Sequence, residues 1–109
     1  YTRPQQERVR GSYSAEKRTA LNQRHFWWDD SNVEHIADHG VEPFEAEEVI
    51  NNRPLVSRAG EGKLIAYGQT DVGRYLVVVY ALKDKQRLRV ITARDMTQAE
   101  KSRIRGRRK

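Results

Sequence analysis

The spacing of apolar residues changes along the chain from helical to extended, and the informative part starts near residue 26. The aromatic run Phe26–Trp28 is typical of the start of a strand. Ser31 and Glu34 follow with the spacing of a capping box, in which a hydroxyl and a carboxylate satisfy free amides at a helix start. This spacing predicts a helix that runs to about His39 and ends at Gly40, a residue suited to the left-handed position after a helix.

A second helix is predicted directly after this one. Pro43 fits its first turn, because proline lacks the amide that a helix start leaves unpaired. Its apolar stripe consists of Phe44, Val49 and Ile50, and Asn51-Asn52 ends it.

The remainder of the chain has the pattern of an antiparallel sheet followed by a helix. The continuous β-branched run in residues 74–82 indicates a strand that is covered on both faces and is therefore central. A second capping box, Thr97 to Glu100, predicts a terminal helix as far as about Arg105. The expected strands are 55–57, 63–70, 74–82 and 87–94, with a turn at 71–73 and a hairpin loop at 83–86.

These elements predict an α+β domain: two N-terminal helices, an antiparallel β-meander of about four strands and a C-terminal helix, with the helices packed against one sheet. We expect residues 1–25 to be an N-terminal extension, because they are polar, interrupted by Pro4 and Gly11, and carry few residues to bury. Residues 26–105 form the predicted domain, and 106–109 a basic tail.

Composition narrows the possible functions. A chain of 109 residues is long enough for one domain. It has no cysteine, which excludes disulfides and thiol catalysis, and no apolar run long enough to span a membrane. The net charge of +6 is unevenly placed: residues 1–25 carry +4, residues 26–70 carry −6 and residues 71–109 carry +8. This asymmetry suggests a polyanionic partner, although a solvated surface with charged helix ends gives the same numbers.

An ordered set of short motifs resembles the BrnT toxin family of bacterial toxin–antitoxin systems, over residues 26 to about 105. The set comprises Phe26-x-Trp28-Asp29, His39-Gly40-Val41, Phe44-Glu45-Ala46-x-Glu48-Val49, Pro54, Gly68-x-Thr70, Gly73-Arg74-x-Leu76-Val77-Val78-Val79-Tyr80 and Arg89-x-Ile91-x-Ala93-Arg94-x-x-Thr97-x-x-Glu100. Two features differ from the family pattern. Asp38 stands where the family usually has Lys, and the 25-residue extension precedes the motifs.

The resemblance implies a RelE-like fold and metal-independent cleavage of RNA that arrests translation, without a cofactor. It also implies a cytoplasmic protein that is neutralised by a BrnA-like ribbon-helix-helix antitoxin. Contact with DNA is then expected only indirectly, through the complex with that antitoxin.

Cleavage of RNA without a metal needs a base for the 2′-hydroxyl, an acid for the 5′-oxygen and cations near the phosphorus. His39 is the candidate acid or base, and capping of the helix end is its alternative role. Arg74 and Arg94 open and close neighbouring strands, so we expect them to point at a common site. We therefore predict His39, Arg74 and Arg94 as catalytic residues.

Lys63, Arg87, Arg89 and Arg103 are the predicted RNA-binding residues, because arginine and lysine bind phosphate oxygens. Arg89 alternates with Leu88 and Val90, so its side chain faces away from theirs. The alternatives are that the arginines lie on a solvent face and that Lys63 discourages edge pairing.

A reading without catalysis also remains open, whereas a metal site is not expected. The same basic surface is equally consistent with a module that binds RNA or a protein partner without cutting anything. His35 and His39 have the spacing of two metal ligands on one helix, but no third ligand with a diagnostic spacing follows, so we expect no metal site.

Overall fold

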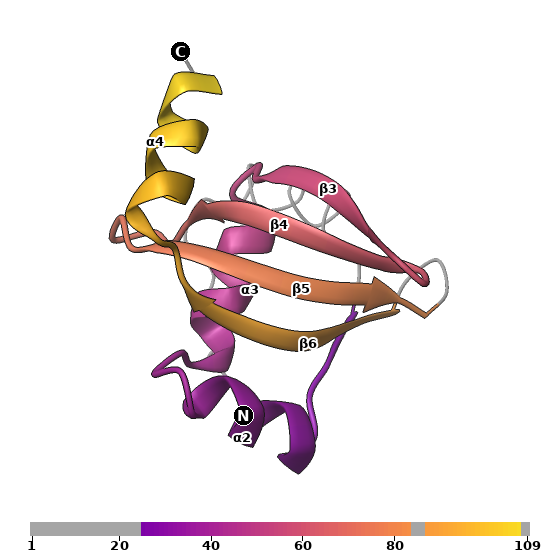
Figure 1. Ribbon diagram of the computed structural model, residues 1–109. Coiled ribbons are helices and arrows are strands. Elements are labelled where there is room, and N and C mark those ends of the chain that lie inside the picture. Colours follow the sequence, from indigo (N-terminus) through magenta and orange to yellow (C-terminus); the bar gives the residue numbers. More distant parts are fainter. Residues whose placement is uncertain (1–24, 84–86, 108–109) are drawn as a thin grey trace, which may run out of the picture.

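The computed structural model describes residues 25–83 and 87–107, with the side chain of the last residue excluded. Residues 1–24 of the predicted extension at 1–25 and most of the predicted hairpin loop lie outside the described residues, and His25 belongs to the first strand. The elements in chain order are β2 (His25–Trp27), α2 (Asp30–Ala37), α3 (Pro43–Asn51), β3 (Leu55–Gly60), β4 (Lys63–Gln69), β5 (Tyr75–Leu82), β6 (Arg87–Asp95) and α4 (Gln98–Arg107) (Figure 1).

The strands form one sheet in the order β2-β6-β5-β4-β3. From β3 to β6 it is the predicted antiparallel meander, and β5 is its central strand. The sheet has a fifth strand, however: β2 precedes the helices and pairs in parallel with β6. The strand start expected at Phe26–Trp28 is confirmed as β2, but the predicted order of two helices followed by four strands left it out of the sheet, because its pairing with β6 depends on a partner about 60 residues away in the chain.

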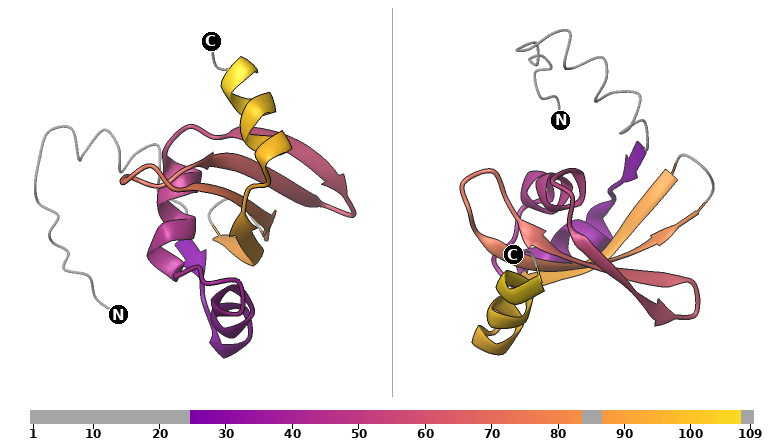
Figure 2. Two further views of the ribbon diagram at one scale, coloured as in Figure 1. Left: turned by 60° about the vertical axis from the view of Figure 1, so that its left-hand side comes forward. Right: turned by 90° about the horizontal axis from the view of Figure 1, so that it is seen from above.

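Helices α2 and α3 pack on one face of the sheet, where the main core lies. Figure 2 shows α4 on the opposite side of the sheet from α3. There Ile104 packs with Val77 and Met96 to form a second, smaller cluster. The main core consists of Ile36, Val41, Ala46, Val49, Ala66, Leu76, Val78, Tyr80, Leu88, Val90 and Ala93.

The start of α2 differs from the prediction. Its N-cap is Asp29, whose carboxylate accepts a hydrogen bond from the Asn32 amide at 3.2 Å. The Asn32 side chain in turn accepts from the Asp29 amide at 2.8 Å, which completes a capping box two residues before the one predicted at Ser31. An aspartate N-cap also complements the helix dipole, which a serine does not.

The other predicted helix boundaries agree closely with the structure. Pro43 begins α3, and α4 is preceded by the Thr97–Glu100 capping box, with hydrogen bonds of 2.9 and 3.1 Å. Phe44 was wrongly assigned to the apolar stripe of α3, since its side chain is 43% exposed. Ala46 and Val49 are fully buried instead, at the three-residue spacing of one helix face.

Candidate functional site

His39 and Arg74 are brought close together at the end of the sheet where β5 begins. His39 is exposed in the turn after α2, and the next residue, Gly40, adopts a φ of +74°. The Arg74 guanidinium donates through Nη1 to the Gly40 carbonyl at 3.0 Å. A left-handed glycine at this position lets the chain reverse beside the guanidinium, so Arg74 fixes the turn that carries His39.

Arg74 is also the centre of an ion-pair network. Its Nε and Nη2 donate to the two carboxylate oxygens of Asp95 at 2.8 and 3.1 Å, and its Nη1 donates to Glu45 at 2.9 Å. The hydrogen bond to Asp95 raises the pKa of Arg74 and lowers that of Asp95. Two carboxylates therefore compensate the charge of Arg74, which joins α3, the α2–α3 turn and the sheet.

Arg94 lies at the same end of the sheet but on its other face. Arg94 is paired with Val77, in the cluster under α4, whereas its neighbour Asp95 is paired with Leu76, in the main core. The expectation that Arg74 and Arg94 point at a common site is therefore not met by their strand positions. The structure places the two guanidinium groups on opposite faces.

The Arg94 guanidinium binds Glu100 of α4 in bidentate fashion. Both hydrogen bonds measure 2.9 Å, and Arg94 also donates to the Asp95 carbonyl at 3.0 Å. The bond to Arg94 lowers the pKa of Glu100 to about 2, and that of Arg94 is raised by the same contact. Arg94 thus ties the start of α4 to the sheet.

A β-bulge in β6 decides which arginines share a face. Tyr80 is paired with Val90, but the preceding Val79 is paired with Thr92, so Ile91 is an extra residue. Simple alternation would put Arg89 and Arg94 on opposite faces, whereas the bulge returns Arg94 to the face of Arg89. Arg87, Arg89 and Arg94 consequently form one row along the face that α2 and α3 leave uncovered.

Arg89 is held by the N-cap of α2. Its guanidinium donates to the two Asp29 carboxylate oxygens at 2.7 and 3.4 Å, and this contact lowers the pKa of Asp29. The guanidinium carbons of Arg87 and Arg89 lie 4.9 and 5.3 Å from the centre of the Trp27 ring. Two of the predicted RNA-binding residues are therefore assembled around an exposed tryptophan.

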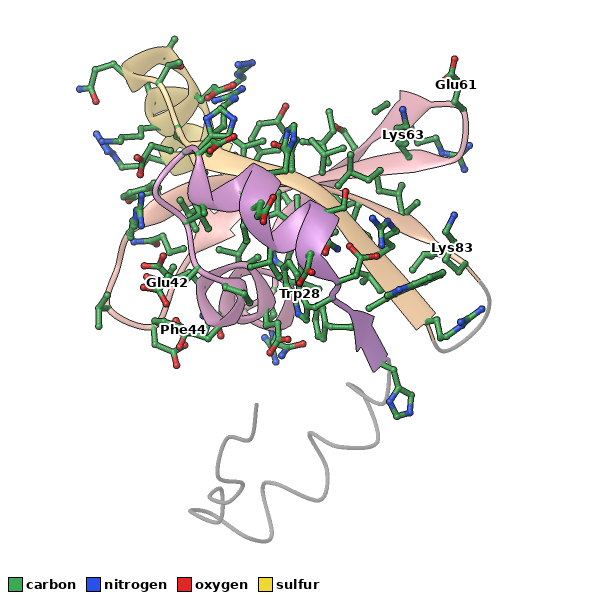
Figure 3. All side chains as sticks on the ribbon, turned by 90° about the horizontal axis from the view of Figure 1, so that it is seen from below. Trp28, Glu42, Phe44, Glu61, Lys63 and Lys83 are labelled. Atoms are coloured by element: carbon green, nitrogen blue, oxygen red, sulfur yellow. The ribbon has the colours of Figure 1, made fainter. Side chains whose placement is uncertain are left out.

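Lys63 belongs to the same end of the sheet as this pair, since Ala81 of β5 is paired with Lys63 on one side and Arg89 on the other. Figure 3 shows Lys63 and Lys83 at one end of the molecule, and Glu42 and Phe44 at the other. Lys63 is 3.7 Å from the highly exposed Glu61. An exposed ion pair of this kind contributes little to the stability of the fold. Arg103 is exposed on α4, apart from this group.

The predicted site residues thus form separate groups: His39 with Arg74, Arg87 and Arg89 with Lys63, and Arg94 with α4. Sequence reasoning did not find the carboxylates that hold the arginines, Asp29, Asp95 and Glu100. These carboxylates are 60, 21 and 6 residues from the arginines they bind, and only the capping-box spacing of Glu100 left a local signal.

Within residues 25–83 and 87–107, no three His, Asp or Glu side chains converge as metal ligands. The His35 and His39 rings are tilted, with their centres 6.0 Å apart. None of the helices in the described part of the chain is long and apolar enough to cross a membrane.

Comparisons with known proteins give a consistent result. A family model described as "Ribonuclease toxin, BrnT, of type II toxin-antitoxin system" matches residues 27–100. The fold is similar to the 1.1 Å crystal structure of the Brucella abortus ribonuclease toxin, BrnT, with 21% sequence identity and a TM-score of 0.57, over 69% of this chain and 97% of that chain. No curated protein shows significant similarity to the sequence. Because the family model spans well over half of its residues, the chain belongs to the BrnT family of ribonuclease toxins of type II toxin–antitoxin systems.

Proposed function

We propose that this protein is a metal-independent endoribonuclease whose cleavage of RNA arrests translation. The observation that carries the proposal is the row of Arg87, Arg89 and Arg94 on the open face of β6, continued at one end by Lys63. A row of cations along one strand follows the repeating negative charge of an RNA backbone. The proposed cleavage requires no cofactor.

His39 is the proposed acid or base, because it is exposed in a turn that Arg74 fixes through the Gly40 carbonyl. Arg74 itself acts as a positioning residue, since its donors are occupied by Asp95, Glu45 and Gly40. Arg94, at the same end of the sheet but on the face opposite Arg74, supplies positive charge to an RNA phosphate once RNA replaces Glu100 as its partner. Each acid–base role is worth about 10²–10⁴-fold in rate.

The test is incubation of the purified protein, free of antitoxin, with end-labelled RNA in EDTA. We expect cleavage in wild type and a loss of at least about 10²-fold in His39→Ala and Arg94→Ala. Val72→Ala is the matched control, because Val72 is 89% exposed in the β4–β5 turn.

Wild-type levels of cleavage in folded His39→Ala and Arg94→Ala proteins would overturn the site assignment. Cleavage that stops in EDTA and returns with Mg²⁺ would contradict the metal-independent chemistry. Thermal unfolding and circular dichroism of each variant separate loss of activity from loss of fold.

The proposed partner is a BrnA-like ribbon-helix-helix antitoxin that neutralises the toxin in the bacterial cytoplasm and is itself the DNA-binding member of the complex. Copurification of the two proteins, together with inhibition of RNA cleavage at a 1:1 ratio, is the expected result. An antitoxin that binds the protein without reducing cleavage would contradict neutralisation by this contact.

A second candidate function is a module that binds RNA without cutting it. The compensation of Arg74, Arg89 and Arg94 by carboxylates favours this alternative, since a paired guanidinium offers less charge to a phosphate. Asp38, directly before His39, adds a further negative charge. Salt-dependent binding of RNA that remains intact after long incubation would support the binding module and exclude the nuclease.

A further inference from the structure

Trp27 is exposed beside the arginine row of β6, and the proposed function gives this side chain no role. Its side chain lies on the third residue of β2 and is 38% exposed. The adjacent residues have different environments: Phe26 packs against the main core, and the Trp28 Nε1 donates to Glu47 at 2.7 Å. An exposed tryptophan beside two anchored aromatic residues is an available flat surface.

The planar groups around Trp27 are set in place by other residues. The guanidinium carbons of Arg87 and Arg89 lie over the Trp27 ring, 4.9 and 5.3 Å from its centre, so both guanidinium groups stack on the indole. Arg89 is already paired with Asp29 at 2.7 Å. It therefore contributes mainly a flat face and not an uncompensated charge.

The position of β2 is fixed by Asn32, whose side chain is almost completely buried. Its Nδ2 donates to the carbonyls of Trp27 and Val90, both at 2.9 Å. This amide holds the edge strand on β6 immediately before the bulge. The Trp27 patch is consequently preorganised and loses little conformational entropy when a ligand binds.

Positive charge lies at the same end of the sheet. Lys63 occupies the row of Ala81 and Arg89, and Lys83 follows the end of β5 (Figure 3). Flat π surfaces beside cations are suited to a ligand with planar rings and a phosphate chain. Arg94 lies four ladder positions from Arg89, because Ile91 is bulged out, which is about 13 Å at a rise of about 3.3 Å per residue.

We propose that Trp27, with the guanidinium planes of Arg87 and Arg89, is a stacking subsite for an unpaired base of single-stranded RNA. Lys63 and Lys83 bind the adjoining phosphates. The inference rests on the proposed function in taking RNA as the ligand, but it assigns the Trp27 patch to binding and not to cleavage. The subsite holds the strand at a distance from the scissile bond and selects single strands, because a paired base presents no free face.

The first measurement is tryptophan fluorescence in a Trp28→Phe background, where Trp27 is the only tryptophan of the chain. The probe is a short 2′-O-methyl oligoribonucleotide, which has no 2′-hydroxyl and cannot be cut. We expect saturable quenching of Trp27 by the single strand. A duplex of the same sequence, or poly-glutamate at equal charge, produces little quenching. Equal quenching by poly-glutamate would overturn base stacking in favour of a surface that receives an acidic protein segment.

The second measurement is the affinity for a labelled 2′-O-methyl strand, using Trp27→Phe and Trp27→Leu in the otherwise native protein. Both replacements are apolar and suit a strand, but only phenylalanine keeps a ring. We expect Trp27→Phe to bind within about threefold of wild type and Trp27→Leu to bind about tenfold more weakly, as stacking energies indicate. Equal affinity of the two variants would overturn the subsite.

A third variant guards against loss of β2 in Trp27→Leu. Arg87→Lys keeps the charge and removes the guanidinium plane. A loss of several-fold in affinity supports stacking, whereas unchanged affinity contradicts a role for that plane. The experiments separate the stacking subsite from the proposed nuclease activity. Quenching and tight binding without any cleavage of ordinary RNA would support the subsite and contradict the nuclease. Cleavage of ordinary RNA without quenching of Trp27 would support the nuclease and contradict the subsite.

Discussion

Asn32 is a buried polar residue that holds together the elements around the Trp27 patch. Its side chain is 2% exposed and makes three hydrogen bonds: two donated to carbonyls of β2 and β6, and one accepted from the Asp29 amide. It therefore connects the start of α2, the edge strand and the bulge. A buried polar side chain with all its groups satisfied specifies one arrangement of the elements around it.

We predict that Asn32→Ala destabilises the domain by about 2–3 kcal/mol, because the buried Val90 carbonyl and the partly buried Trp27 carbonyl lose their donor. Ser31→Ala is the matched control, since Ser31 is exposed and Asp29 caps the helix; its effect stays within about 0.5 kcal/mol. Urea denaturation of the three proteins measures both differences. A loss in Ser31→Ala as large as that in Asn32→Ala would contradict the observed cap.

At the scale of elements, α4 is held to the sheet by few contacts. Ile104 packs with Val77 and Met96, and Lys101 and Arg105 lie 5.8 Å from the Tyr75 ring centre. The bidentate pair of Arg94 with Glu100 supplies the polar part of this attachment. Since the pKa of Glu100 is lowered to about 2, its contribution to stability depends on pH.

The sign of that dependence follows from the lowered pKa. The stabilisation is fully present above the ordinary pKa of glutamate, about 4.3, and is lost as the pH falls towards 2. We therefore expect Glu100→Gln to be less stable than wild type at pH 6 by about 1 kcal/mol, since Arg94 is partly solvated. The difference between the two proteins narrows as the pH falls and is smallest at about pH 2.

Urea midpoints at both pH values measure this convergence. Glu61→Gln is the control, because Glu61 is highly exposed and 3.7 Å from its partner Lys63. A difference between Glu100→Gln and wild type that is the same at both pH values would show that ionisation of Glu100 does not stabilise α4.

At the scale of the whole molecule, charge is separated between the two ends of the sheet. The end with Lys63, Lys83 and Arg89 faces away from the end where Arg74 is surrounded by carboxylates (Figure 3). The overall charge of +6 is thus a poor guide to where an anion binds. The local balance of charges at each end determines the electrostatic attraction.

We expect RNA affinity to depend on salt through the first of these ends. Lys63→Gln makes the slope of log K against log salt shallower by about 0.7, the value for one phosphate contact on a single strand. Arg53→Gln leaves the slope unchanged, because Arg53 precedes β3 at the other end of the sheet. Equal slopes for Lys63→Gln and wild type would remove Lys63 from the interface.

Much of the fold was predictable because its signals are local. Pro43, the Thr97–Glu100 capping box and the β-branched run of β5 each act within a few residues, and each element was found with nearly the right bounds. The family was also predictable, since its motifs retain their order along the chain, and the family model confirms it.

The candidate site was less predictable. Arg89 and Arg74 each depend on a carboxylate far away in the sequence, at Asp29 and Asp95. The expectation that Arg74 and Arg94 point at a common site was wrong, and nothing in the sequence indicated that Arg94 shares a face with Arg89, because a bulge leaves no sequence pattern as strong as a turn or a cap. The catalytic and RNA-binding roles of the predicted residues stay predictions.

The sequence by itself determined which segments are helices and strands, the antiparallel order of the meander and the membership of the BrnT family. Only the tertiary structure decided that β2 joins β6 in parallel, that Ile91 returns Arg94 to the face of Arg89, and which carboxylate holds each arginine. The physical reason is the distance along the chain between the groups that interact. Capping and β-branched packing are settled between neighbours in the chain, whereas pairing of edge strands and of buried charges depends on groups that only the folded chain brings together.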